Sequence, residues 1–177
     1  MATKSGTVNL SKVVIPPWVF DGSVTIPIAL YDPSVTKLTK ATFKYTVTSY
    51  YAAADVRFNV EGVEIAREDW GAFDFPFVGT RTGEVDITPY VEGKPQIQLT
   101  VYAHDFRFDI NLATEFPLDL KIILEYTGTE PTLEPGKPEG SGIPTEIPWN
   151  KLMWVGVGTL GVVGLVATAS LIKSLKR

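Results

Sequence analysis

The one histidine of the chain, His104, lies in the stretch YAHDFRFDI beside Asp105 and close to Asp109. A histidine near carboxylates suggests a metal site or a general acid–base pair. A calcium site needs six or more oxygen ligands, and only these two carboxylates are local. On a strand, Asp105, Arg107 and Asp109 would share one face, where an exposed ladder of ion pairs is the simpler interpretation. We therefore predict no metal site.

Covalent chemistry has little support in the sequence. The chain contains no cysteine, which removes disulfides, thiolate ligands and cysteine nucleophiles together. A serine nucleophile would need a setting such as G-x-S-x-G, and none occurs. Paired carboxylates for sugar hydrolysis stay open, because their separation is a three-dimensional property, but nothing singles out two of the sixteen acids in residues 1–126. We predict no enzyme, no catalytic residue and no cofactor.

Two aromatic-rich segments are stronger candidates for function. The stretch REDWGAFDFPFVGTRTG, residues 67–83, mixes one tryptophan and three phenylalanines with acids, and PPWVFDG, residues 16–22, holds two more rings. Exposed rings of this kind stack on sugars or anchor a partner protein, whereas inward-facing rings would close one end of a β-sandwich. Both alternatives stay open. The candidate contact residues are Trp18, Phe20, Trp70, Phe73, Phe75 and Phe77.

These segments interrupt a pattern of short strands. Apolar and polar residues alternate with a period of two, which is typical of half-buried antiparallel strands, and Gly62 provides a turn between two of them. Pro27 places its strand at a sheet edge, because proline cannot donate a ladder hydrogen bond. We predict an all-β, antiparallel two-sheet sandwich of seven to nine strands. The alternating segments are 24–30, 43–47, 56–60, 63–65, 97–101 and 118–124.

The stretch GEVDITPYVEGKPQIQLTVYA, residues 83–103, resembles a signature of galactose-binding-like jelly-roll domains. Residues 42–65 resemble the pair of strands around a short turn in the same fold, so the resemblance covers about half of the domain. It implies a jelly-roll-like sandwich in which Asp86 and Thr88 close a short turn. It also implies carbohydrate binding as one of the many functions of that fold. Lys94-Pro95 departs from the family pattern, and viral capsid proteins use jelly rolls too.

A linker follows the predicted domain of residues 1–126. The stretch 127–148 holds five prolines, four glycines and four glutamates, a composition typical of a semi-extended spacer. At about 3.1 Å per residue it would reach roughly 70 Å. We predict a linker over residues 127–150.

Residues 152–172 predict a transmembrane helix. The 21 residues carry no charge, and at 1.5 Å per residue they span about 32 Å, close to the roughly 30 Å of a hydrocarbon core. Residues 151–177 therefore form the predicted anchor. Its interfacial residues would be Trp149, Lys151, Trp154, Lys173, Lys176 and Arg177. A face of small residues suited to helix–helix contact comprises Gly158, Gly161, Gly164 and Thr168.

The orientation of this anchor is constrained by two signals. Pro16 and Pro17 interrupt the first apolar run, so no cleavable signal peptide is expected, and an anchor without one is inserted after translation with the domain in the cytosol. The basic tail KSLKR prefers the cytosolic face instead. Both conditions are met in a virion with an internal membrane, where the domain lies outside the vesicle and the basic tail inside.

Charge separates the three parts of the chain in the same way. Residues 1–126 carry 11 basic and 16 acidic side chains (−5), the linker one and four (−3), and residues 151–177 four and none (+4), which gives the net charge of −4. With a pI near 5.0, no specific nucleic-acid binding is expected. We expect a single-pass membrane protein that ties a shell protein to lipid in a virion or cell envelope as part of an oligomeric assembly. The alternative is a cell-surface module that binds glycans.

Overall fold

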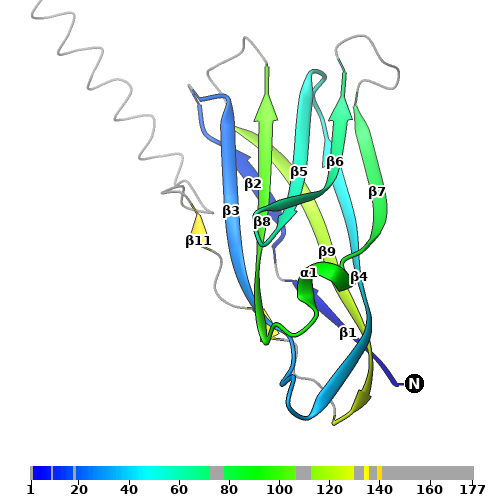
Figure 1. The fold of residues 1–177 in the computed structure, drawn as a ribbon. Coiled ribbons are helices and arrows are strands. Elements are labelled where there is room, and N and C mark those ends of the chain that lie inside the picture. Colours follow the sequence, from blue (N-terminus) through cyan, green and yellow to red (C-terminus); the bar gives the residue numbers. More distant parts are fainter. Residues whose placement is uncertain are drawn as a thin grey trace, which may run out of the picture. The chain divides into compact units, whose positions relative to one another are not determined.

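The computed structural model describes residues 2–8, 10–17, 19–71, 78–106, 113–129, 134–135 and 139–140. These residues form antiparallel strands in two facing sheets, with one short helix between two strands (Figure 1). The predicted all-β, two-sheet antiparallel sandwich is confirmed. In chain order the elements are β1 (Ala2–Val8), β2 (Lys12–Ile15), β3 (Asp21–Ala29), β4 (Thr36–Ser49), β5 (Ala54–Val60), β6 (Val63–Trp70), β7 (Gly79–Asp86), α1 (Thr88–Val91), β8 (Gln96–Asp105), β9 (Thr114–Gly128), β10 (Glu134–Pro135) and β11 (Glu139–Gly140).

The chain crosses repeatedly from one sheet to the other. One sheet, here the β9 sheet, has the strand order β1–β9–β4–β7, and β2 also pairs with β9. The other, the β8 sheet, has the order β10–β3–β8–β5–β6, and β11 also pairs with β3. From β2 to β9, only the β5–β6 connection stays within one sheet. The connections therefore gather at two ends of the sandwich.

We name the two ends by their connections. The loop end, at the top of Figure 1, holds the β2–β3, β4–β5, β6–β7 and β8–β9 connections. The far end holds the β3–β4 and β5–β6 connections and the segment around α1 between β7 and β8. The longer strands thus run between the two ends, and residues distant in the sequence meet at each end.

The core lies between the sheets, where the alternating apolar residues face each other. Inward positions of β4 and β5 supply an aromatic group: the ring of Phe58 lies 5.5 Å from that of Phe43 and stacks at 4.4 Å on that of Tyr45. All three side chains are buried. Every alternating segment predicted from the sequence lies within or across a strand of the structure. The period-two pattern therefore reports real burial, because successive side chains of a strand face opposite sides of its sheet.

Two predicted turns have the expected geometry. Glu61 and Gly62 between β5 and β6 both have positive φ, 53° and 80°, as a two-residue hairpin turn requires. Before α1, the Oδ1 atom of Asp86 accepts the backbone N–H of Thr88 at 2.9 Å and its hydroxyl at 2.5 Å. These bonds lower the pKa of Asp86, because they favour the ionised carboxylate. The sequence thus placed both reversals correctly.

The connection predicted over residues 67–83 is shorter in the structure. β6 continues to Trp70, and β7 begins at Gly79 and pairs with β4. β7 has no apolar alternation to reveal it, because its inward positions hold Gly79, Arg81 and Gly83 before Val85. It is an edge strand that pairs on one side, where such a sequence is tolerated.

Part of the segment predicted as a linker pairs with the sandwich. β9 continues to Gly128, and the chain then returns along β3 through two short bridges, β10 against Ala29 and Ile28 and β11 against Thr25 and Val24. The bridges stop on either side of Pro27, which has no N–H to offer. β3 is therefore an edge strand that the C-terminal segment partly covers.

The other predictions for the C-terminal part lie outside the described residues. These are most of the linker, the anchor at 152–172, the interfacial residues (Trp149, Lys151, Trp154, Lys173, Lys176, Arg177) and the small-residue face (Gly158, Gly161, Gly164, Thr168). Among the residues that the structure describes, no helix has the length and apolar character needed to cross a bilayer.

Candidate functional site

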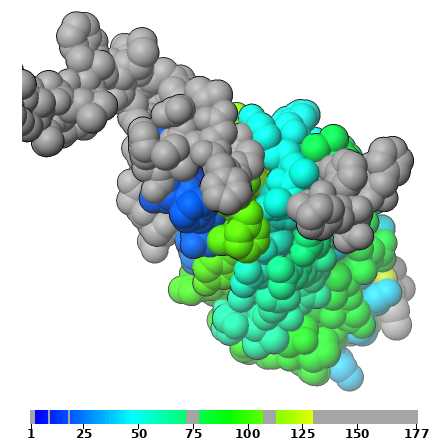
Figure 2. Space-filling view, turned by 90° about the horizontal axis from the view of Figure 1, so that it is seen from above, coloured from blue at the N-terminus to red at the C-terminus, as the bar shows by residue number. Residues whose placement is uncertain are grey.

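The loop end brings separate segments of the chain together around the last residues of β8. The backbone N–H of Asp105 donates to the carbonyl of Phe20 at 2.9 Å, and the N–H of Phe106 donates to the carbonyl of Ala53 at 3.0 Å. The β2–β3 and β4–β5 connections therefore flank the end of β8 on its two sides. Figure 2 looks onto this end and shows the blue, green and cyan segments next to one another.

Large apolar side chains are exposed at this end. Five of the eight exposed large hydrophobic residues in the described part of the chain belong to loop-end connections. Three of the five are aromatic, and no exposed aromatic ring lies at the far end among the described residues. With their exposed fractions the five are Val19 (46%), Phe20 (49%), Tyr50 (65%), Val78 (44%) and Phe106 (61%). Exposed apolar side chains gathered at one place are typical of a contact surface.

The candidate contact residues from the sequence have different outcomes. Phe20 is on the surface of the loop end, as a contact residue must be. Trp70 is fully buried at the end of β6; its indole N–H donates to the carbonyl of Gly79 at 3.1 Å, and its ring lies 6.3 Å from that of Phe116. The packing alternative therefore describes Trp70. Trp18, Phe73, Phe75 and Phe77 lie outside the described residues.

Sequence reasoning missed four residues of this surface: Val19, Tyr50, Val78 and Phe106. Each lies within three residues of a strand end, in a connection that the predicted strands already implied. Their shared location depends on which connections meet at one end, and that is a property of the strand order. A jelly-roll order assumed from the resemblance would have grouped them.

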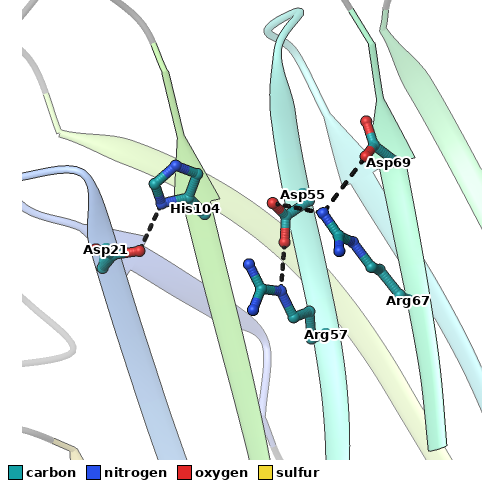
Figure 3. A network of polar contacts seen from close by, with 6 residues as sticks. All are labelled: Asp21, Asp55, Arg57, Arg67, Asp69 and His104. Atoms are coloured by element: carbon teal, nitrogen blue, oxygen red, sulfur yellow. Dashed lines mark hydrogen bonds and ion pairs between the residues drawn. The ribbon is translucent and has the colours of Figure 1, made fainter. Parts of the chain in front are cut away.

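A row of charged residues crosses the outer face of the β8 sheet beside the loop end (Figure 3). Ladder pairing places Asp21, His104, Asp55 and Asp69 side by side on β3, β8, β5 and β6. His104 Nδ1 lies 2.5 Å from Asp21 Oδ1, a pair separated by 83 positions in the sequence. The next row of this face carries the two arginines that complete the network.

Asp55 is the centre of this network. Its side chain is nearly inaccessible, although it lies on an outward position of β5. Arg57 Nε donates to Asp55 Oδ1 at 2.8 Å, and an Nη atom of Arg67 donates to Asp55 Oδ2 at 3.2 Å. Hydrogen bonding to this carboxylate raises the pKa of Arg57 further above its ordinary value. Asp69 adds a looser contact with Arg67 at 3.6 Å.

His104 and Asp105 face opposite sides of the β8 sheet. Asp105 points inward, is buried and accepts the hydroxyl of Thr114 at 2.8 Å, whereas His104 points outward to Asp21. The sequence motif H-D therefore does not form one cluster; Arg107 and Asp109 lie outside the described residues. Within the described ranges, no three His, Asp or Glu side chains converge as a metal site would require. His104 Nε2 is buried and has no hydrogen-bond partner among the residues that the structure describes.

A partly buried polar contact lies between β6 and β7. The hydroxyl of Tyr45, an inward residue of β4, donates to Oε1 of Glu68 at 2.6 Å. Burial, and next the bond to Glu68, raise the pKa of Tyr45 far above its ordinary value. Gly83 leaves the space through which the phenol reaches Glu68, since a Cβ there would lie 2.2 Å from the ring. This contact ties the two sheets together at one edge.

Comparisons with known proteins identify no family for the chain. No family model matches it, and no curated protein does. Among solved structures, an acetyl xylan esterase from the rumen bacterium Butyrivibrio proteoclasticus is similar over 73% of this chain, with 11% identity and a TM-score of 0.34. The matched region makes up 34% of that esterase, so this chain spans about a third of its length.

The match corrects one prediction. The sequence predicted that the chain is not an enzyme, and a solved structure to which it is similar is that of an enzyme. The prediction that the chain is not an enzyme is therefore withdrawn. At this identity and TM-score the match equally assigns no activity to the chain.

Proposed function

We propose that this chain is a membrane-attached interaction protein, which uses the loop end of a jelly-roll sandwich as its contact surface. Its setting would be a virion or a comparable envelope, where it ties a protein shell to the bilayer. The observation that carries the proposal is the group of five exposed apolar side chains on connections of one end. Exposing such side chains in water is unfavourable, so a partner that covers them gains about 25 cal/mol for each Å² of apolar surface removed from water.

The jelly-roll assignment is supported by the strand order. β2–β9–β4–β7 faces β3–β8–β5–β6, and all connections from β2 to β9 except β5–β6 change sheet. This is the winding of an eight-stranded jelly roll, a fold used in viral capsids and in lectins. The fold alone does not choose between these uses.

Membrane attachment is supported by the sequence of residues 152–172. The segment is uncharged, long enough to cross a bilayer, and bounded by tryptophan and basic residues. The contrast between the acidic sandwich and the basic last 27 residues supports opposite sides of a membrane for the two.

Glycan binding is a second candidate, supported by one ring on a sheet face. Tyr102 on β8 is 44% exposed on the outer face of the β8 sheet, between Ser23 and Arg57 in the ladder. A ring flanked by hydrogen-bonding side chains suits stacking on a sugar. Binding of the chain to a glycan array, lost in Tyr102→Ala and kept in the matched Tyr50→Ala, would favour this candidate.

The test of the main proposal is cross-linking of the full chain in its own particles or membranes. A lysine-reactive cross-linker has acceptors on the sandwich at Lys37, Lys40 and Lys94. We expect links to one lattice-forming protein in fixed stoichiometry, and retention of the chain in the membrane fraction after alkaline washing. A chain that is released by the wash, or that is dispersed without any stoichiometric partner, would refute the proposal.

A further inference from the structure

We infer that the loop end faces the bilayer and that its exposed apolar side chains insert into the lipid interface, which leaves the far end for the shell. The inference rests on the proposed membrane attachment and names the partner of the same surface. It follows from the path of the chain after β9, from the chemistry of the exposed side chains, and from the contrast between the two ends.

The path of the chain leads toward the loop end. β9 ends at Gly128 at the far end, where it pairs with Thr36. The return along β3 then begins at Ala29 and reaches Val24 by Gly140. β3 starts at the loop end with Asp21, so Gly140 lies three strand positions, about 10 Å, from that end.

The remaining chain is short. Between Gly140 and the apolar segment at 152–172 lie eleven residues, which span at most about 40 Å when fully extended. Gly140, from which they start, lies close to the loop end. Placing the far end at the bilayer would require the chain to reverse and pass back along the sandwich.

The exposed side chains suit a lipid interface. Phe20, Tyr50 and Phe106 supply rings, and aromatic side chains are enriched where hydrocarbon meets headgroups. Valines at 19 and 78 add apolar surface. The neighbouring charges are largely paired within the row centred on Asp55, where acids outnumber arginines. Insertion would therefore depend on the apolar side chains and not on attraction between basic residues and anionic lipid.

The far end has a different surface. Val35 in the β3–β4 connection and Val63 at the start of β6 are exposed there, but no aromatic ring is exposed at this end among the described residues. Glu61 pairs with Lys94 at 3.1 Å and accepts the N–H of Gln98, and together with Lys37 and Glu92 these residues make the end polar. Such a surface loses more on entering lipid, because charged groups pay for desolvation.

The experiment uses matched cysteines in the full chain, which has none of its own. Val19→Cys and Val78→Cys mark the loop end, and Val35→Cys and Val63→Cys mark the far end. All four replace exposed valines, with exposed fractions of 46%, 44%, 49% and 45%. Each variant receives an environment-sensitive fluorophore and is reconstituted into phosphatidylcholine vesicles, and quenching by brominated lipid and by aqueous iodide is measured.

We expect brominated lipid to quench the two loop-end labels several-fold more strongly than the far-end labels, and iodide to show the opposite order. Replacing Tyr50 and Phe106 by serine should reduce the lipid quenching at residue 19. Equal quenching at all four positions, in a chain that stays with the vesicles, would overturn the inference and leave the attachment intact. Protection of loop-end labels only after shell protein is added would overturn it in favour of a protein partner. A chain that does not stay with vesicles at all refutes the proposed function itself.

Discussion

Gly83→Ala should destabilise the sandwich through one side chain, Tyr45. Gly83 lies opposite Tyr45 in the β4–β7 ladder, and a Cβ at that position would lie 2.2 Å from both Cζ and Oη of the phenol. Ordinary contact begins at about 3.4 Å, so the ring or the strand must move by more than about 1 Å. Neither is free to do so without losing contacts.

The contacts of Tyr45 give the magnitude. Its ring stacks on Phe58 at 4.4 Å, and its hydroxyl is bonded to Glu68 at 2.6 Å. Loss of a hydrogen bond to a charged group costs about 1.5–3 kcal/mol, and overpacking costs about 1–3 kcal/mol. Alanine returns about 0.5–1 kcal/mol because it is less flexible than glycine in the unfolded chain. We expect a net loss of about 2–4 kcal/mol in the free energy of unfolding.

A double-mutant cycle isolates this effect. In Tyr45→Ala the obstacle is gone, so adding Gly83→Ala should cost nothing or stabilise slightly. The measurement is urea unfolding of the full chain in mild detergent, followed by tryptophan fluorescence, with the outward-facing neighbour Thr82→Ala as control. An equal loss from Gly83→Ala in both backgrounds would refute the reasoning, because the cost would then come from the backbone of β7.

Three other outcomes are expected in the same unfolding assay. Asp55→Asn should cost about 1–3 kcal/mol, because its buried carboxylate holds two guanidinium groups, while Asp69→Asn, which is exposed, should cost less than about 0.5 kcal/mol. The raised pKa of Tyr45 keeps its proton in the folded state after the unfolded state has lost it. Stability should therefore fall as pH rises above about 10, by up to about 1.4 kcal/mol per pH unit, and fall less steeply in Tyr45→Phe; parallel pH profiles would contradict this. Trp70→Ala should cost about 3–5 kcal/mol as a core truncation, and a change in partner contact without loss of stability would show that its ring is not part of the core.

The predictable part of the fold was the part with alternating burial. β3, β4, β5, β8 and β9 carry an apolar residue at nearly every inward position, so the sequence located them. The apolar alternation did not locate β7, because Gly83 makes room for Tyr45 and Arg81 replaces an apolar residue. In β7, packing against residues distant in the sequence determines which side chains occupy the inward positions, so no local sequence pattern indicates the strand.

The sequence predicted the kind of candidate site, a contact surface with aromatic residues, but not which of these residues are exposed. Aromatic residues between strands indicated a contact surface, and Phe20 is exposed as a contact residue must be. Trp70 and Phe20 both lie in aromatic-rich segments, but Trp70 ends strand β6 and is covered by the core, whereas Phe20 lies in a connection and is 49% exposed. The pair of His104 with Asp21 joins residues 83 positions apart, and only the β3–β8 register brings them together.

The pairing of four residues in β10 and β11 with β3 shortens the chain between the sandwich and residue 152. Without β10 and β11, the chain would leave the sandwich at Thr129 at the far end, and the 22 residues 130–151 would reach up to about 75 Å, enough to allow any orientation at a membrane. With the pairing, only eleven residues separate residue 152 from Gly140, which lies near the loop end. A backbone hydrogen bond contributes only about 0.5–1.5 kcal/mol, so this attachment alone is a weak constraint. Insertion of the exposed rings would act in the same direction, and the two effects together would hold one end of the sandwich toward the bilayer.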